Sequence, residues 1–145
     1  MVIDELFADK NRAATERMRS LAACLTDEEL QQRVGEHWTI AIAYTHLAWW
    51  DQRTLDVLDK VERAGEVLVP QLDTFVNDVS LPLWAVVPPR EAVRVAVETA
   101  VTLDTRLENY PRHLLEKVYA DTPRWVVRAI HRNEHLDEVD AVLAE

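Results

Sequence analysis

Residues 37–65 read HWTIAIAYTHLAWWDQRTLDVLDKVERAG, and this stretch decides the fold. Thr39 is of a residue type that accepts a hydrogen bond from the first turn of a helix, and Gly65 is typical of the position just after a helix ends. Residues 40–50 contain no Asp, Glu, Lys or Arg. A helix that is apolar on nearly every side is buried on most of them. The stretch therefore predicts one long helix at the centre of a helical bundle.

Three further long helices are predicted around it. Residues 3–23 place Leu6, Met18 and Leu21 at helical spacing. Residues 90–109 carry apolar side chains at the same spacing, namely Val93, Val97, Val101 and Leu107. Each of these segments therefore has one apolar side that we expect to face the core.

The last helix begins with a start signal. Asp121 or Thr122 caps it and Pro123 lies in its first turn, so we expect helix from there almost to the final residue. Just before it, residues 112–120 predict one or two further helical turns.

Two connections are also informative. Residues 26–34 contain a capping box, in which Thr26 and Glu29 bond reciprocally, and they predict a short helix that Gly35 ends. Pro82 lies within residues 73–87, and Pro88 and Pro89 follow directly, so we expect this stretch to be irregular or to form a short helix.

Composition agrees with this helical pattern. The chain has 145 residues, a length that favours a single domain spanning residues 1–145. It contains only 2 glycines, whereas sheets and tight hairpins depend on glycine for their turns. The predicted fold class is all-α, a four-helix bundle with short extra helices in its connections.

The net charge of the chain limits the classes of molecule that we expect it to bind. The formal net charge is −10, so we expect no binding to nucleic acid or to anionic membrane surfaces. No apolar run approaches the roughly 20 residues that span a bilayer, and no apolar leader is visible. Cys24 is the only cysteine, which excludes an internal disulfide. A cytoplasmic location is the expectation.

Two histidines, His131 and His135, stand four residues apart in the predicted last helix. Side chains at this spacing share one helix face, with roots about 5–6 Å apart, so both rings can reach one metal ion. His46 interrupts the apolar central helix and is the candidate third ligand. Taken alone, each has an ordinary alternative: a buried histidine bonded to a carbonyl or hydroxyl, or a solvated pair on a helix surface.

The stretch 37–51 resembles the signature of the DinB and YfiT-like metalloenzyme superfamily. In that signature a tryptophan and a Ser or Thr open the second helix, and the ligand histidine follows eight residues after the tryptophan. The matching residues here are Trp38, Thr39, His46, Leu47, Ala48 and Trp50. The family's second motif, HxxxH near the start of the last helix, matches His131, His135, Leu136 and Asp137.

This resemblance covers nearly the whole chain, and it implies a metal site formed by His46, His131 and His135. The SLPLWAVVPP segment, residues 80–89, departs from the family pattern, so the shape of the pocket is not carried over. Some mycothiol-dependent relatives have a glutamate at the first position of the last-helix pair, whereas this chain keeps all three histidines.

The resemblance also implies a function. Three neutral imidazoles leave a divalent ion, Zn²⁺ or Ni²⁺, with open positions for water or substrate. The leading expectation is metal-activated transfer of a low-molecular-weight thiol to an electrophile, with that thiol and a small-molecule electrophile as partners. The alternatives are a metal-dependent hydrolase of the same superfamily, or a non-catalytic, stress-related metal-binding bundle. A homodimer is expected, formed through an apolar face of the first or third long helix.

Residues around the histidines add weaker predictions. Arg128, three residues before His131, and Trp50 are candidates for binding substrate. Asp51 and Glu134 are candidate bases or imidazole partners, with a solvated charge as the simpler interpretation. Trp49 and Trp125 are candidates for pocket walls or for core packing, and His37 and His113 are expected at the surface.

Overall fold

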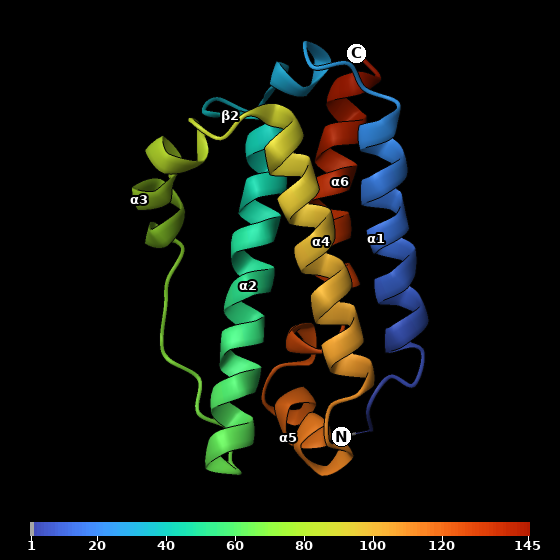
Figure 1. Cartoon of the computed structure of the whole chain (residues 1–145), viewed down its shortest axis with the longest axis vertical. Helices are drawn as coiled ribbons and strands as arrows, with labels where there is room; N and C mark the ends of the chain where they lie inside the picture. The colour runs from blue at the N-terminus through green and yellow to red at the C-terminus, as the bar shows by residue number, and fades with distance from the viewer. Residues whose placement is uncertain (1) are drawn as a thin grey trace.

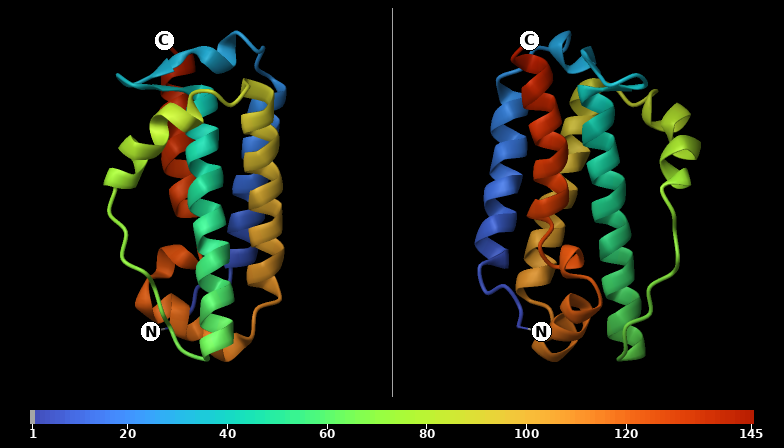
Figure 2. Two further views of the ribbon diagram at one scale, coloured as in Figure 1. Left: turned by 60° about the vertical axis from the view of Figure 1, so that its left-hand side comes forward. Right: turned by 180° about the vertical axis from the view of Figure 1, so that it is seen from behind.

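The computed structural model describes residues 2–145, in which four long helices lie side by side (Figure 1). They are α1 (Phe7–Ala23), α2 (Ile40–Ala64), α4 (Pro89–Glu108) and α6 (Ala129–Leu143). The turned views in Figure 2 keep the four together along a common direction. The predicted all-α class is confirmed.

Short elements connect the long helices. A single turn, η1 (Glu29–Gln31), and two short strands, β1 (Arg33–Val34) and β2 (Trp38–Thr39), lie between α1 and α2. Helix α3 (Phe75–Trp84) stands beside α2, away from the other long helices (Figure 2). At the end of the molecule where the chain begins lie α5 (Arg112–Asp121) and η2 (Pro123–Trp125). None of the helices in residues 2–145 combines the length and apolar character needed to cross a bilayer.

Helix α2 begins and ends as its sequence predicts. The Thr39 hydroxyl accepts a hydrogen bond from the amide of Ile42 at 3.1 Å, which satisfies one unpaired donor of the first turn. Gly65 has φ +72°, and its amide donates to the carbonyl of Val61 at 2.8 Å. Nearly all side chains of the first two turns of α2 are buried, so this helix does form the centre of the core.

Helix α1 begins later than predicted, at Phe7 instead of residue 3. The Asp4 carboxylate accepts a hydrogen bond from the amide of Leu6 at 2.9 Å, and the Asp4 carbonyl accepts from Phe7. These bonds form a turn before the helix. As a result Leu6, which was expected in the apolar stripe, is 58% exposed.

The prediction of a short helix through residue 34 is wrong for its last residues, because the helical turn ends at Gln31. The capping box forms as expected, because Thr26 and Glu29 each accept from the other's amide at 3.0 Å. After η1, however, Arg33 and Val34 pair antiparallel with β2. Gly35, with φ +73°, allows the reversal that begins this hairpin.

The proline-rich region forms a regular helix. Helix α3 spans ten residues and contains Pro82. The sequence predicts either an irregular segment or a short helix here, and the structure shows the short helix. The amide of Asn77 donates to the carbonyl of Thr74 at 2.9 Å, so the helix starts with a tight turn.

The last helix is broken where continuous helix was predicted. Pro123 lies in the separate turn η2, and α6 starts only at Ala129. Asn11 of α1 explains the break, because its amide nitrogen donates to the carbonyl of Val126 at 2.8 Å. Its oxygen accepts from the amide of Ala129 at 2.9 Å. A cap from another helix thus sets the start of α6.

Helix α2 packs most extensively against α4. Ala92, Ala96 and Ala100 of α4 are buried in the core cluster that the first turns of α2 also form, and Leu103 and Leu107 continue this buried face. The valines predicted to face the core, such as Val93 and Val97, are only partly buried beside it. Because distance between packed helices depends on the side chains at the contact, these alanines let α4 approach α2 closely.

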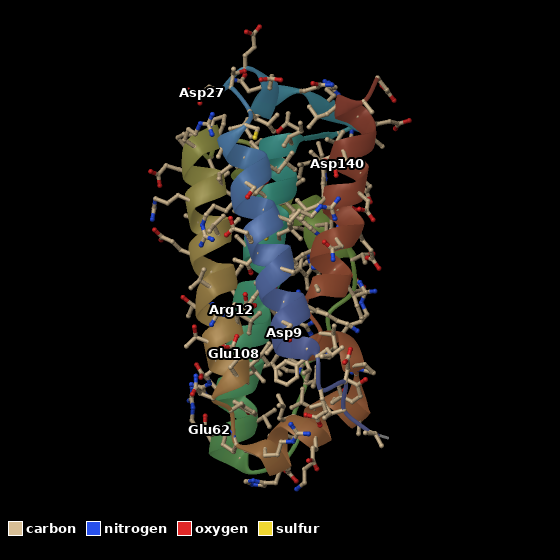
Figure 3. All side chains as sticks on the ribbon, turned by 90° about the vertical axis from the view of Figure 1, so that its right-hand side faces the viewer. Asp9, Arg12, Asp27, Glu62, Glu108 and Asp140 are labelled. Atoms are coloured by element: carbon tan, nitrogen blue, oxygen red, sulfur yellow. The ribbon has the colours of Figure 1, made fainter. Side chains whose placement is uncertain are left out.

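Ion pairs at the surface join α1 to its neighbours. Arg12 donates to Glu108 of α4 at 2.7 Å, and Arg17 donates to Asp140 of α6 at 2.7 Å. Figure 3 shows Arg12 and Glu108 on the facing sides of the two helices. Exposed pairs of this kind are each worth about 0–1 kcal/mol, so they support the arrangement without deciding it.

Replacing Ala96 with leucine should lower the free energy of unfolding by about 1–3 kcal/mol, because a larger side chain does not fit between α4 and α2. Val95→Leu enlarges the neighbouring side chain, which is 39% exposed, and should change that free energy by less than about 0.5 kcal/mol. Urea unfolding followed by circular dichroism measures both. Equal effects would show that the alanine face is not closely packed.

Candidate metal centre

Three histidines from two helices converge at one point. His46 comes from α2, and His131 and His135 come from the beginning of α6. One ring nitrogen from each lies within 4.8 Å of the other two. Nε2 of His46 is 3.1 Å from Nε2 of His131. The structure therefore brings together the three histidines named from the sequence, and they could hold a metal ion.

Aromatic side chains enclose this cluster. The ring of Trp38 lies 4.6 Å from that of His46 and stacks on His135 at 5.7 Å, measured between centroids. Trp84 meets His46 edge-on at 5.5 Å. These rings exclude water from one side of the histidines, so the cluster lies in an environment of low polarity.

Burial keeps the histidines neutral. It lowers the pKa of His46 to about 3, with a further contribution from His135. Burial, followed by the nearby charge of Arg128, lowers the pKa of His131 to about 2. The pKa of His135 is also lowered, again chiefly by burial. Only a neutral imidazole has a lone pair free for a metal, so the site favours the form that binds an ion.

Two of the three histidines have a buried ring nitrogen that forms no hydrogen bond within residues 2–145. A histidine buried for packing alone is normally bonded to a carbonyl or hydroxyl. In residues 2–145, however, Nδ1 of His46 and Nδ1 of His135 are buried and have no hydrogen-bond partner. The nitrogen of His135 lies 3.9 Å from a carboxylate oxygen of Glu138, beyond hydrogen-bond distance. This donor set fits a divalent ion such as Zn²⁺ or Ni²⁺ better than it fits a satisfied core.

Arg128 contacts the cluster directly. Its Nη2 lies 3.2 Å from Nδ1 of His131, and its Nε donates to Asp51 at 2.9 Å. A guanidinium only donates, so Nδ1 of His131 accepts and the neutral ring carries its proton on Nε2, toward His46. Arg128 thereby sets the tautomer and orientation of His131. A neutral ring that binds an ion through Nε2 carries its proton on Nδ1, so ion binding would require the contact between Arg128 and His131 to change.

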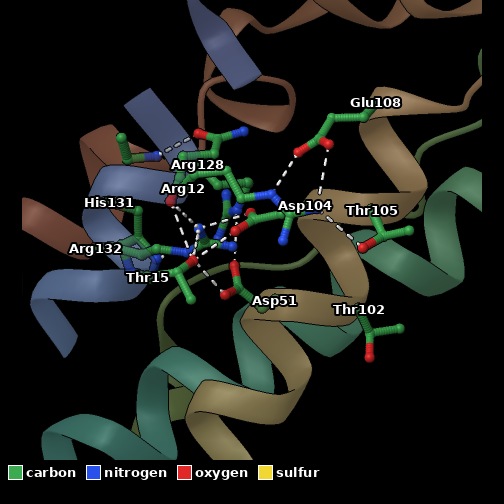
Figure 4. Close-up of polar contacts among 12 residues, drawn as sticks. Arg12, Thr15, Asp51, Thr102, Asp104, Thr105, Glu108, Arg128, His131 and Arg132 are labelled. Atoms are coloured by element: carbon green, nitrogen blue, oxygen red, sulfur yellow. Dashed lines mark hydrogen bonds and ion pairs between the residues drawn. The ribbon is translucent and has the colours of Figure 1, made fainter. Parts of the chain in front are cut away.

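A buried ionic network continues from Arg128 into the core (Figure 4). Arg132 is fully buried, and it donates to Asp51 at 3.1 Å and to Asp104 at 2.8 Å. The hydroxyl of Thr15 accepts from Arg132 at 3.0 Å and donates to Asp104. Two arginines thus face two aspartates, and the charges balance. The members come from α1, α2, α4 and α6, so the network joins all four long helices.

A cavity of about 380 Å³ opens beside the histidines. Trp38, Trp50 and Trp125 contribute apolar walls to it. The indole nitrogen of Trp50 donates to the side-chain oxygen of Asn77 at 2.8 Å, and this bond joins α3 to α2 at the edge of the cavity. The site is therefore reachable by a small molecule, and aromatic rings form part of its walls.

The formally charged side chains that line this cavity are all positive. Three arginines line it, namely Arg53, Arg124 and Arg128, and no Asp or Glu does within the part of the chain that the structure describes. This contrasts with the net charge of −10 for the whole chain. An anionic or electron-rich group is therefore the natural occupant.

Comparison with known families agrees with this geometry. The family model described as "DinB superfamily" matches residues 11–138. The chain belongs to the DinB superfamily. No curated protein and no solved structure matches it significantly. The DinB superfamily match includes every residue of the histidine cluster and of the buried network.

Within this DinB superfamily domain, the residues predicted to bind substrate both line the cavity. Trp50 forms part of the wall, whereas Arg128 is only 7% exposed and already bonded to Asp51. The simpler interpretation of Asp51 as a solvated charge is wrong, because it is fully buried. Glu134 is exposed and pairs with Arg124 at 2.8 Å.

The remaining candidates divide between cavity and surface. Trp125 lines the cavity, and Trp49 is absent from its lining. His37 and His113 are exposed and lie away from the cluster, as expected. Sequence reasoning missed a set of residues that belong to the cavity or to the network: Asn11, Thr15, Trp38 as a wall, Arg53, Asp104, Arg124 and Arg132. For Asp104 a signal did exist, because a carboxylate in line with Ala100 and Leu107 marks a charge on an apolar face.

Replacing Arg132 with methionine should lower the free energy of unfolding by about 3–5 kcal/mol, since it leaves Asp104 buried without its cation. Arg17→Met removes a surface arginine that pairs with Asp140 and should cost less than about 1 kcal/mol. Adding Asp104→Asn to Arg132→Met should recover part of the loss. Denaturant unfolding of the four proteins measures these effects. Equal losses in the two single variants would contradict the assigned role of the network.

The free energy of unfolding of the metal-free protein should decrease as the pH is lowered. Histidine in the unfolded chain binds a proton near its ordinary pKa of 6.5, whereas folded His46 binds one only near pH 3. The unfolded state therefore gains protons, and stability is lost, as the pH falls through this window. From pH 7 to pH 5 we expect His46→Gln to lose about 1–2 kcal/mol less than the parent. Parallel pH profiles of unfolding would contradict this.

Proposed function

We propose that this DinB superfamily protein is a metal-dependent enzyme that transfers a low-molecular-weight thiol to an electrophile. The observation that carries the proposal is the incomplete set of protein ligands at the cavity. His46, His131 and His135 converge there, and residues 2–145 offer no fourth His, Cys, Asp or Glu atom within the same 4.8 Å. A structural metal site is normally closed by four protein ligands, whereas a catalytic site keeps a position open.

The chain's own residues would supply binding and orientation. The three histidines would hold the ion, and the bond between Arg128 and Asp51 would hold the start of α6 against α2 beside them. A bound Zn²⁺ or Ni²⁺ lowers the pKa of a thiol or water that binds it, so that a nucleophile is available at neutral pH. The aromatic walls would exclude bulk water from the electrophile.

The transfer itself is balanced without any further reactant. The thiol sulfur forms a bond to the electrophilic carbon, and the bond between that carbon and its leaving group breaks. The thiol loses its proton, which ends on the leaving group or in solvent. Nothing is oxidised or reduced.

The lining of the cavity favours a thiol over water as the nucleophile. Hydrolysis of an ester or amide usually needs a base near the attacking water, and carboxylates serve that role most often after histidine. In the described residues no carboxylate lines the cavity, and the histidines are committed to the metal. A thiol has an ordinary pKa near 8.5, far below that of water, and needs less help to lose its proton.

The proposal includes the finer features expected from the sequence: a four-helix bundle of the DinB and YfiT type, a cytoplasmic location and a homodimer. For self-association, four of the most exposed apolar side chains lie on or just after α3, whereas the long helix α4 exposes only Val95 among the large apolar side chains of residues 2–145. The four are Phe75, Val79, Leu83 and Val86.

The first test is the metal content of protein purified without an affinity tag. We expect about one equivalent of Zn or Ni in the parent, because three histidines form one site. His46→Ala and His131→Ala each leave two ligands and should lose most of the metal. His37→Ala is the matched control, since His37 is 75% exposed and lies outside the cluster, and should keep it. Stoichiometric metal in His46→Ala would overturn the site.

The second test measures transfer in the metal-loaded protein. Cysteine, glutathione and mycothiol are each offered with a chlorodinitrobenzene electrophile, and thioether formation is followed by mass. Activity should follow metal content across the parent, His46→Ala and His37→Ala. Full metal loading with thioether formation no faster than in His46→Ala, for all three thiols, would overturn thiol transfer for this electrophile class. Ester hydrolysis by the same samples would then favour the hydrolase alternative.

A further inference from the structure

Arg53 is a cavity-lining cation without a carboxylate partner. It comes from α2, and its guanidinium lies 5.3 Å from the ring of Trp50 and 4.8 Å from the ring of Trp125. Its Nη2 donates to the carbonyl of Pro70 at 2.7 Å. In the part of the chain that the structure describes, no acidic side chain forms an ion pair with it.

The other two arginines of the cavity differ in this respect. Arg124 forms two hydrogen bonds with Glu134, at 2.8 and 3.0 Å. Arg128 is bonded to Asp51 at 2.9 Å. Their charges are therefore neutralised within the chain, and the charge of Arg53 is the one left for a ligand.

The surroundings of Arg53 make an anion the favourable occupant. Partial burial, followed by the repulsion of Arg128, lowers the pKa of Arg53, which means that its charged form is stabilised less than it would be in water. An anion beside the guanidinium would attract its positive charge and so oppose the lowering of the pKa of Arg53. The two indole rings hold the planar group in place, and its free N–H donors suit the two oxygens of a carboxylate.

The position of Arg53 on α2 also sets how far a group bound to it lies from His46. His46, Trp50 and Arg53 follow one another on one side of α2, at four and three residues apart, and all three line the cavity. A helix rises about 1.5 Å per residue, so Arg53 and His46 are separated by about 10 Å along the axis. Trp50 lies between them and offers an apolar surface to whatever spans that distance.

We propose that the electrophile is an organic carboxylate, bound at one end by Arg53, with an apolar or aromatic body against Trp50 and Trp125 and its reactive carbon toward the histidines. This assignment rests on the proposed function for the identity of the reactive end. The carboxylate subsite itself is formed by Arg53 and the two tryptophans.

The test uses full-length protein treated with EDTA and then desalted, because an ion on the histidines would itself bind a carboxylate. The probes are benzoate, phenylacetate, 3-phenylpropionate and 4-phenylbutyrate, each paired with its neutral amide. Binding is followed by titration calorimetry and by the fluorescence of the cavity tryptophans. We expect at least one acid to bind about tenfold or more tightly than its amide.

Substitutions assign that preference to Arg53. Arg53→Gln should abolish the difference between acid and amide, and Arg53→Lys should keep part of it, since lysine retains the charge without the two-pronged donor. Arg63→Gln is the matched control, because Arg63 is an exposed arginine of the same helix outside the cavity. It removes the same charge and should leave the preference intact. Circular dichroism confirms that each variant is folded.

The outcomes separate this inference from the proposed enzyme. No preference for any acid over its amide in the parent would overturn the carboxylate subsite, whatever the metal content. An equal loss of acid and amide binding in Arg53→Gln would show that Arg53 only packs the tryptophans, and would also overturn it. A preference that depends on Arg53 in a protein that binds no metal would support the subsite and remove the proposed enzyme.

Discussion

The buried pairing of Arg132 with Asp51 and Asp104 is the interaction on which the arrangement of the helices depends. Charges buried this deeply are tolerated only when each finds its partner, so the helices that carry them have few acceptable positions relative to one another. The network also uses the hydroxyl of Thr15, and so it holds α1, α2, α4 and α6 in one register. Apolar packing between α2 and α4 supplies the driving force, and the ionic network selects one geometry from those that would bury similar area.

The same network reaches the functional site. Asp51 bonds both buried arginines, and one of them, Arg128, contacts His131. The orientation of a candidate metal ligand is therefore set by charges in the core and not by the surface of α6. This arrangement explains why the site and the packing of the helices are difficult to separate: the side chains that position His131 are also those that hold α2 against α6.

The cavity presents a local charge opposite to that of the molecule. The acidic side chains that give the chain its net charge of −10 are mostly at the surface, whereas the cavity is lined by arginine, tryptophan and histidine. Two of its arginines are neutralised within the chain, and Arg53 is not. Net charge describes the whole surface, so it does not exclude an anionic small molecule from a cavity that is lined by arginines.

Sequence alone determined the features that depend on neighbours along the chain. The cap at Thr39, the stop at Gly65, the capping box at Thr26 and the shared face of His131 and His135 are all local, and each is present in the structure. Only the tertiary structure decided the features that depend on another element: the start of α6, which Asn11 caps from α1, the alanine face of α4, and the burial of Asp51. The physical reason is that hydrogen bonds within one turn join residues at fixed spacing. Ion pairs and caps between helices join residues as much as 123 positions apart, and no pattern along the chain records that distance.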